Sequence, residues 1–340
     1  MKRTVAWLLM GAALAFGCST PPEGDTGDKG SGVAGDKKLQ IAVIPKGATH
    51  EFWKSVHEGA QKAADETGVQ IVWKGPIKED DRESQVKTVE DFINQKVDGI
   101  VLAPLDDTAL RGPVEEAKRN EIPTVIIDSG LKDADYVSFV ATDNYKGGQM
   151  AGAEMIKLMA DLGKPKARIV MLRYQEGSAS TMEREKGFLD MVKNEPKIEV
   201  VSSNQYGGAT TETAQKAGEN LLAPLKKPDG SLDIDGIYTP NESTTFGMLR
   251  VLQDNNWAGK VKFIGFDASP KLIEGLTNGH INGLILQNPR KMGELGVKTI
   301  VDYLKGNKDV EKRIDTGATL ITKENMDSTE NKALLAPPKV

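Results

Sequence analysis

The sequence predicts an α/β protein made of two doubly wound parallel sheets. From Leu39 onward, short apolar runs alternate with amphipathic stretches, which is the cadence of strand, helix and strand. Val, Ile and Leu fill the apolar runs almost continuously, as strands covered on both faces require. The 340 residues leave enough chain after the first 38 for two domains of ordinary size, and two sheets suit the number of strands better than one.

The chain begins with the pattern of an export signal. Lys2 and Arg3 precede an apolar run, Val5–Phe16, that is too short to span a bilayer and that ends just before Cys18. The letters LAFGC up to Cys18 resemble a bacterial lipoprotein signal, and this is the only cysteine of the chain. We therefore expect residues 1–18 to be a signal segment, with lipid attached at Cys18 and the protein exported to the periplasm or cell surface. The alternative is a free secreted protein whose cysteine is incidental.

The next segment, residues 19–38, is predicted to be a flexible tether. It consists mainly of Pro, Gly, Asp, Ser and Lys, and Val33 is its only large apolar residue. Such a composition cannot bury enough apolar surface to offset the entropy lost on ordering.

Nine apolar runs after the tether are the predicted strands, with a further short run at Val137–Thr142. The nine are Leu39–Ile44, Val69–Trp73, Gly99–Ala103, Thr124–Asp128, Arg168–Leu172, Ile198–Ser202, Gly236–Thr239, Val261–Phe266 and Gly283–Gln287. Apolar residues recur at helical spacing in the intervening segments Trp53–Thr67 and Gln85–Gln95. This order predicts parallel strands joined by right-handed crossovers.

Composition excludes several classes of protein. A net charge of −5 and a pI near 5.5 argue against a nucleic-acid-binding surface. Three histidines, His50, His57 and His280, do not form a zinc pattern. The segment Ser231–Glu242 imitates a calcium loop, but Ser231 replaces the leading aspartate and Ile237–Thr239 reads as strand. We expect no metal and no cofactor.

Polar and aromatic residues follow the predicted strands at their carboxyl ends, which is where open parallel sheets bind ligands. They include Lys46, His50, Glu51, Phe52, Trp53, Asp128, Ser129, Arg173, Tyr174, Gln175, Glu176, Arg184, Asn241, Glu242, Asp267, Gln287 and Asn288. Planar carboxylate, amide and guanidinium groups can bind neighbouring hydroxyls in pairs, and aromatic faces can cover the C–H surface of a ring. The pattern indicates a polyhydroxylated ligand.

These residues lie in segments whose order and spacing resemble the ribose/galactose-type periplasmic sugar-binding proteins, the type I substrate-binding proteins of ABC importers. The match runs from Leu39 to about Leu320. The segments that carry it are EFWKSVHEGAQKAADETG, VDGIVLAP, IPTVIID, ATDNYKGGQMAG, EREKGF, PNESTTFGMLRVLQ, FIGFDASP and ILQNP.

The resemblance implies two lobes joined by three hinge crossings, near Asp143, near Gln287 and near Gly317–Thr319. An N-terminal lobe of residues 39–143 plus 288–317 and a C-terminal lobe of residues 144–287 plus 318–340 follow. It also implies a binding protein, not an enzyme, that captures a monosaccharide and delivers it to the permease and ATPase subunits of an ABC importer. We expect a monomer that binds no nucleic acid and is held at a membrane by its lipid.

The resemblance also assigns candidate ligand contacts. Phe52 and Trp53 match the stacking aromatic residues, and His50 stands where an amide is usual. Asp128, Asn241, Asp267 and Gln287 match polar contacts, and Arg184 matches a charged clamp. Two departures suggest a different sugar or pose: Ser129 replaces an arginine, and Lys46 replaces a small hydroxyl residue. Tyr206 is the candidate for the third aromatic residue of the family's ribose site.

Each assignment has a structural alternative. Asp128 and Asp267 could cap the helices that follow them, and Phe52 and Trp53 could be core residues. Two alternative functions also remain: a sensory protein that presents a polyol or signal molecule to a receptor, and an enzyme that uses Asp128 and Asp267 as paired acids.

Overall fold

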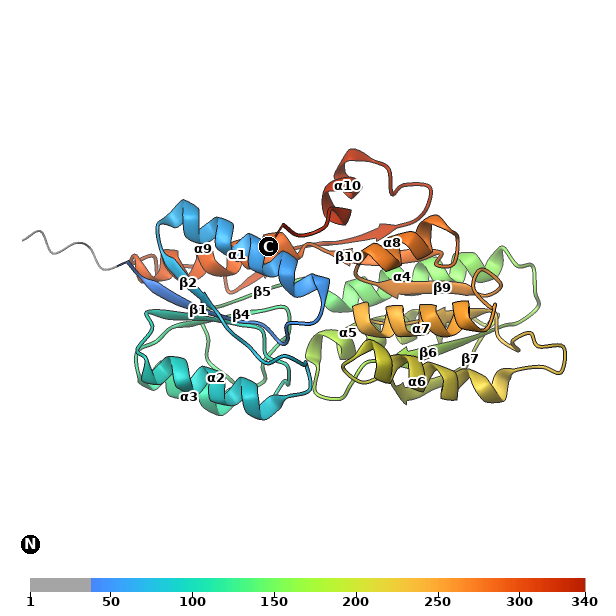
Figure 1. The fold of residues 1–340 in the computed structure, drawn as a ribbon, viewed down its shortest axis with the longest axis horizontal. Helices are drawn as coiled ribbons and strands as arrows, with labels where there is room; N and C mark the ends of the chain where they lie inside the picture. The colour runs from blue at the N-terminus through green and yellow to red at the C-terminus, as the bar shows by residue number, and fades with distance from the viewer. Residues whose placement is uncertain (1–37, 340) are drawn as a thin grey trace, which may run out of the picture. The chain divides into compact units, whose positions relative to one another are not determined.

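The computed structural model describes residues 38–339 and contains two six-stranded sheets (Figure 1). The predicted signal segment, Cys18 and residues 19–37 of the predicted tether lie outside the described residues. Within the described part of the chain, no helix is both long and apolar enough to cross a bilayer.

The first sheet has the strand order β11-β5-β4-β3-β1-β2, and all its strand pairs are parallel. Its strands are β1 (Gln40–Ile44), β2 (Gln70–Trp73), β3 (Gly99–Leu102), β4 (Thr124–Ile127), β5 (Ser138–Ala141) and β11 (Arg313–Asp315). Its helices are α1 (Glu51–Thr67), α2 (Arg82–Asn94), α3 (Arg111–Arg119) and α9 (Pro289–Leu304). We call this sheet with its helices the first lobe.

The second sheet has the order β12-β10-β9-β8-β6-β7 and repeats the topology of the first. Its strands are β6 (Ala167–Arg173), β7 (Ile198–Tyr206), β8 (Gly236–Tyr238), β9 (Lys262–Phe266), β10 (Gly283–Gln287) and β12 (Ala318–Ile321). Its helices are α4 (Asn144–Ala160), α5 (Ala179–Val192), α6 (Thr211–Leu222), α7 (Glu242–Asp254), α8 (Pro270–Thr277) and α10 (Thr329–Leu335), with a short 3₁₀ turn η1 (Ala223–Leu225). We call this unit the second lobe.

The predicted α/β fold with two doubly wound sheets is confirmed, with one correction. The sequence did not mark β11 and β12 as strands, and β12 pairs with β10 in antiparallel orientation. Both are short edge strands with partly exposed residues, so they lack the continuous apolar run that marks a buried strand.

Each sheet is buried on both faces, which explains its apolar strands. In the first lobe, α1 and α9 cover one face and α2 and α3 the other (Figure 1). In the second lobe, α4 and α5 cover one face and α6, α7 and α8 the other. The segment that imitates a calcium loop enters β8, and its Asp233 and Asp235 pair with Arg168 and Lys164.

Glycine permits two unusually close helix contacts, one in each lobe. A Cβ atom on Gly59 of α1 would overlap the carbonyl of Arg290 on α9, and one on Gly293 of α9 would overlap the carbonyl of Val56. Gly148 of α4 has the same relation to the carbonyl of Arg184 on α5. These contacts fix α1 and α5, the helices whose first turns face the space between the lobes.

Gly59→Ala is expected to destabilise the protein by about 1–3 kcal/mol or more, because the added methyl group forces α1 and α9 apart. Gly112→Ala is the matched control: this exposed helical glycine has open space where its Cβ would be, so alanine should gain about 0.5–1 kcal/mol. Urea denaturation of both variants measures the difference. Equal stability of the two would contradict the close contact.

Candidate functional site

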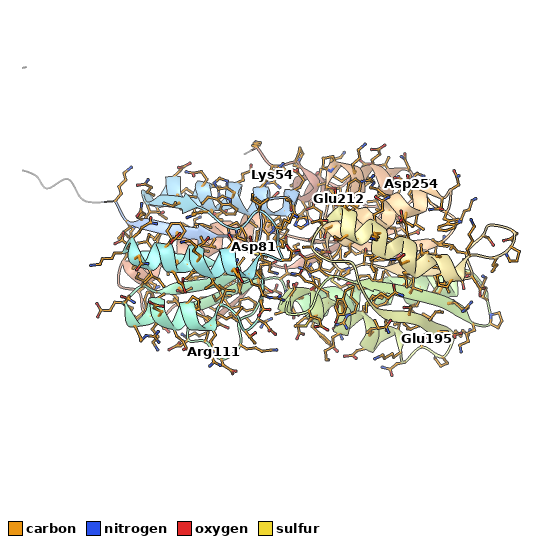
Figure 2. The ribbon with its side chains drawn as sticks, turned by 60° about the horizontal axis from the view of Figure 1, so that its bottom comes forward. Lys54, Asp81, Arg111, Glu195, Glu212 and Asp254 are labelled. Carbon is orange, nitrogen blue, oxygen red and sulfur yellow. The ribbon has the colours of Figure 1, made fainter. Side chains whose placement is uncertain are left out.

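The carboxyl ends of the strands in both sheets meet at a small cavity between the lobes. The cavity measures about 30 Å³. It is lined by Lys46, His50, Phe52, Trp53, Glu79, Asp128, Tyr174, Ser178, Ser180, Thr181, Arg184, Asn241, Glu242, Asp267 and Gln287. Figure 2 shows Asp81, the N-cap residue of α2, at the end of that helix that faces the second lobe.

A buried ion pair forms part of the first lobe's wall. Lys46, which follows β1, lies 2.7 Å from Asp128, which follows β4, and both side chains are almost fully buried. The Lys46 ammonium also donates to the hydroxyl of Ser180 on α5, at 3.0 Å. The cation therefore bridges the two lobes, and it balances a carboxylate that burial would otherwise disfavour.

Glu79 gathers a second group of partners. It follows β2 and pairs with His50 Nδ1, while Trp53 Nε1 donates to it at 2.6 Å. From the second lobe, the Tyr174 hydroxyl donates to its other oxygen at 2.7 Å. Each Glu79 oxygen is thus bonded, and one of the bonds joins the lobes.

Phe52 and Trp53 serve two roles at once. Their rings meet edge to face, with centroids 4.9 Å apart, and both line the cavity. Both also belong to the apolar cluster between α1 and the first sheet. Phe52 and Trp53 are therefore both core residues and cavity residues. This is possible because α1 begins at the cavity and its first turn is buried.

Arg184 is the main cation of the second lobe's wall. Its Nε donates to Asn144 at 2.8 Å and its Nη1 to the carbonyl of Pro240 at 2.9 Å. The guanidinium lies 4.0 Å from the centre of the Phe266 ring, and 3.9 Å from Asp267. These contacts hold the side chain in one orientation at the edge of the cavity.

Asp128 and Asp267 occupy equivalent positions in the two lobes. They follow β4 and β9, and both adopt left-handed backbone conformations, with φ of 62° and 66°. Non-glycine residues rarely adopt this conformation, and such strain concentrates at functional sites. In both lobes the unusual turn brings a carboxylate to the cavity.

The helix-cap alternative is wrong for both aspartates. The N-cap of α8 is Ser269, not Asp267, and the element that follows Asp128 is the strand β5. Asp267 instead accepts from Gln287 Nε2 at 2.8 Å and from the backbone N–H of Glu242 at 3.2 Å. Asn241 does act as a cap, because its Oδ1 accepts from the N–H of Thr244 while its side chain lines the cavity.

Two predicted contacts, Ser129 and Tyr206, do not line the cavity. Ser129 is fully buried, and its hydroxyl accepts from the Ser180 N–H at 3.0 Å. Tyr206, at the end of β7, instead stacks under the guanidinium of Arg173 at 4.7 Å. The other predicted residues, from Lys46 to Gln287, all line it.

Six lining residues were not among the assigned ligand contacts: Glu79, Tyr174, Ser178, Ser180, Thr181 and Glu242. Tyr174 and Glu242 follow predicted strands, so the strand-end pattern already held their signal. Tyr174, not Tyr206, supplies the third aromatic ring of the cavity. Glu79 lies six residues beyond β2 in an irregular segment, and no periodicity could have placed it.

A larger cavity of about 330 Å³ adjoins this one and shares Phe52, Asp267 and Gln287 with it. Its lining includes Pro270 and Ile273 of α8 and the apolar residues of the C-terminal segment 334–338. The C-terminal segment also contacts the first lobe, because Arg290 donates to the carbonyls of Ala336 and Pro337.

Comparison with known proteins identifies the family. Residues 41–308 match the model of the periplasmic binding protein domain. The chain belongs to the periplasmic binding protein family. The resemblance predicted from the sequence is thereby confirmed.

Individual relatives of this periplasmic binding protein agree with that assignment. It is 29% identical to the ribose import binding protein RbsB of Bacillus subtilis, over 95% of this chain and all of the relative. A solute-binding protein of an ABC transporter from Agrobacterium vitis, solved with bound D-fucose, is 37% identical over 87% of this chain and 100% of its own, with a TM-score of 0.81. A carbohydrate transporter solute-binding protein from Agrobacterium radiobacter, in complex with D-arabinose, is 34% identical over 88% and 99%, with a TM-score of 0.81.

Buried charge shifts several pKa values in the cavity of this periplasmic binding protein. Burial alone would lower the pKa of His50, but the Glu79 carboxylate outweighs it and raises the pKa to about 9. Burial alone would raise the pKa of Glu79, but His50 and Lys46 lower it to about 2. Burial raises the pKa of Glu242 to about 7, although His50 and the N–H of Phe52 oppose the shift.

These shifts predict that stability falls as the pH rises from 6.5 to 9. The contribution of protonated His50 is complete below its ordinary pKa of 6.5 and is lost as the pH rises through about 9. In that window the slope of the unfolding free energy against pH should approach the value that corresponds to the release of one proton. The contribution of Glu79 is complete above 4.5 and is lost only as the pH falls toward 2.

Urea denaturation at several pH values measures this slope. His50→Gln should flatten it between pH 6.5 and 9. His280→Gln should leave it unchanged, because the contact described for the His280 ring is with the uncharged amide of Gln253 on the second lobe. An identical slope in the wild type and His50→Gln would rule out the charged His50–Glu79 pair.

Proposed function

We propose that this protein captures a neutral monosaccharide or related polyol between its lobes and delivers it to an ABC importer. The observation that carries the proposal is the chemistry of the cavity: aromatic rings beside hydroxyl, amide and carboxylate groups that converge from both lobes. Among the described residues, Ser178 Oγ and Gln287 Oε1 are buried there without a hydrogen-bond partner. Buried polar atoms are rarely left unpaired, and ligand hydroxyls can donate to both.

The charges support a neutral ligand over a sugar acid or a sugar phosphate. Each cation that lines the cavity has an anionic neighbour: Lys46 pairs with Asp128, His50 with Glu79, and Arg184 lies beside Asp267. An anionic ligand would have to compete with these carboxylates. Hydroxyls can instead share the pairs, by donating to the carboxylates and accepting from the cations.

Binding requires the lobes to separate. A cavity of about 30 Å³ is far smaller than the 300–1,000 Å³ of ordinary ligand pockets, so a sugar ring can enter only if side chains withdraw. The chain passes between the sheets after β5, after β10 and between β11 and β12. We propose that these passages act as the hinge between an N-terminal lobe, residues 39–143 plus 288–317, and a C-terminal lobe, residues 144–287 plus 318–340.

We also propose that the protein acts outside the cytoplasm, as a monomer that binds no nucleic acid. We further propose that lipid on Cys18 and a flexible tether hold it at a membrane near its importer. An enzymatic role is not supported by the cavity, because Asp128 and Asp267 are engaged by Lys46 and Gln287 instead of facing a free nucleophile.

A thermal-shift screen tests the proposal. At least one neutral monosaccharide should raise the melting temperature by several degrees, because a ligand that binds only the folded state stabilises it by mass action. Sugar acids and sugar phosphates should give no shift. The panel should also include cyclitols and nucleosides. If no monosaccharide or polyol stabilised the protein, the proposal would be wrong.

Asp267→Asn is the variant that ties binding to this cavity. Asparagine tolerates the left-handed backbone at this position, whereas alanine would add strain to the loss of contact. Calorimetry should show affinity weakened about 10- to 100-fold, as expected for a charged hydrogen bond. Asp254→Asn, an exposed position of the same lobe labelled in Figure 2, should bind like the wild type.

The lipid anchor has its own test. Cells that produce the wild type and are fed a clickable fatty acid should label the protein, and Cys18→Ser should abolish the label because the thioether cannot form. Membrane fractionation should follow the label. If neither protein takes up fatty acid, this is a free secreted binding protein.

A further inference from the structure

The side chain of Glu242 reaches from one lobe to the other. Glu242 is the first residue of α7 in the second lobe, and its side chain is buried. One carboxylate oxygen accepts from the backbone N–H of Glu51 at 3.2 Å, and the other accepts from the N–H of Phe52 at 3.1 Å. Both donors belong to the first turn of α1 in the first lobe.

Helix α1 has no cap of its own at this end. The first N–H groups of a helix lack partners within it, and a side chain at the N-cap position usually supplies one. The N-cap residue of α1 is His50, whose side chain makes no cap bond and pairs with Glu79 instead. Two other helices that begin near the cavity, α2 and α7, are capped by Asp81 and Asn241, whereas α5 also lacks a side-chain cap bond from its N-cap residue, Ser178.

We propose that Glu242 is a positioning residue that caps α1 across the cleft, so that the helix carrying Phe52 and Trp53 is fully capped only when the lobes are closed. The carboxylate also lies at the positive end of a 17-residue helix, where negative charge is favoured. Opening the lobes breaks both hydrogen bonds and exposes the two N–H groups. The cap therefore contributes to closure independently of any ligand.

The surroundings of Glu242 make this contact sensitive to pH. Its charge interacts with His50, which precedes α1, and with Asp267, which follows β9, and it also accepts from the backbone of the ionisable residue Glu51 on α1. Burial raises its pKa to about 7, so the closed form takes up a proton that the open form releases. Closure should therefore weaken as the pH rises from about 4.5 through 7, and replacing the carboxyl group should remove that component.

Hydrogen–deuterium exchange of the ligand-free protein reads the cap directly. In Glu242→Ala, the amides of Glu51 and Phe52 should exchange about tenfold faster, because no other partner protects them, while the amides of β9 should exchange as in the wild type. Glu242→Gln retains one acceptor oxygen and should lie between the two. After correction for the intrinsic rise of amide exchange with pH, the protection of these two amides in Glu242→Gln should not change between pH 5 and 8, whereas that of the wild type should.

Glu195→Ala is the matched control. Glu195 is on the same lobe and also accepts a backbone N–H, from Lys197, but it precedes β7 at the opposite end of the sheet, away from the cleft (Figure 2). It should leave exchange at Glu51 and Phe52 unchanged. Unchanged exchange in Glu242→Ala, or equal acceleration in Glu195→Ala, would overturn the cap.

The effect on binding rests on the proposed function. With whichever of D-ribose, D-fucose or D-arabinose stabilises the wild type most, Glu242→Ala should weaken affinity about tenfold, the size of a lost helix cap. Unchanged affinity would show that the cap does not contribute to closure. If none of the three sugars binds, the proposed function loses its support, whereas the exchange measurement still decides whether Glu242 caps α1.

Discussion

The cleft depends on one constraint: charges taken out of water must find partners there. Lys46 with Asp128 and His50 with Glu79 are buried pairs whose members come from different loops of the first lobe. Losing one member would leave an uncompensated buried charge, which costs more than the pair itself contributes. The second lobe completes the hydrogen bonding of both pairs, since the Ser180 hydroxyl accepts from Lys46 and the Tyr174 hydroxyl donates to Glu79. Closing the lobes therefore also completes the hydrogen bonding of the buried charges on Lys46 and Glu79.

The repeated topology of the two sheets explains why both walls of the cleft look alike. Equivalent strands, β4 and β9, are each followed by an aspartate with a left-handed backbone. Each lobe also sends one glutamate to the other: Glu79 receives the Tyr174 hydroxyl, and Glu242 receives backbone N–H groups of α1. The lobes thus recognise each other with the same chemistry that can bind hydroxyl groups.

Prediction from the sequence worked best where local patterns determine structure. Continuous apolar runs located the ten principal strands, and their polar ends located Asp128, Asp267 and Gln287. It worked less well where position depends on distant contacts. Tyr206 ends a partly exposed strand and stacks on Arg173, while Tyr174 reaches the cavity because Glu79 accepts its hydroxyl. The local sequence placed Tyr174 at a strand end, but it did not show that this tyrosine, and not Tyr206, reaches the cavity.

The sequence alone determined the α/β class, the alternation of strand and helix, and the family, because these depend on apolar periodicity and on the spacing of short segments. The tertiary structure alone decided which side chains meet. It paired Lys46 with Asp128, buried Ser129 against Ser180, and brought Glu242 to the start of α1. These contacts join residues up to 191 positions apart in the chain, and only the packing of the two sheets sets their distances.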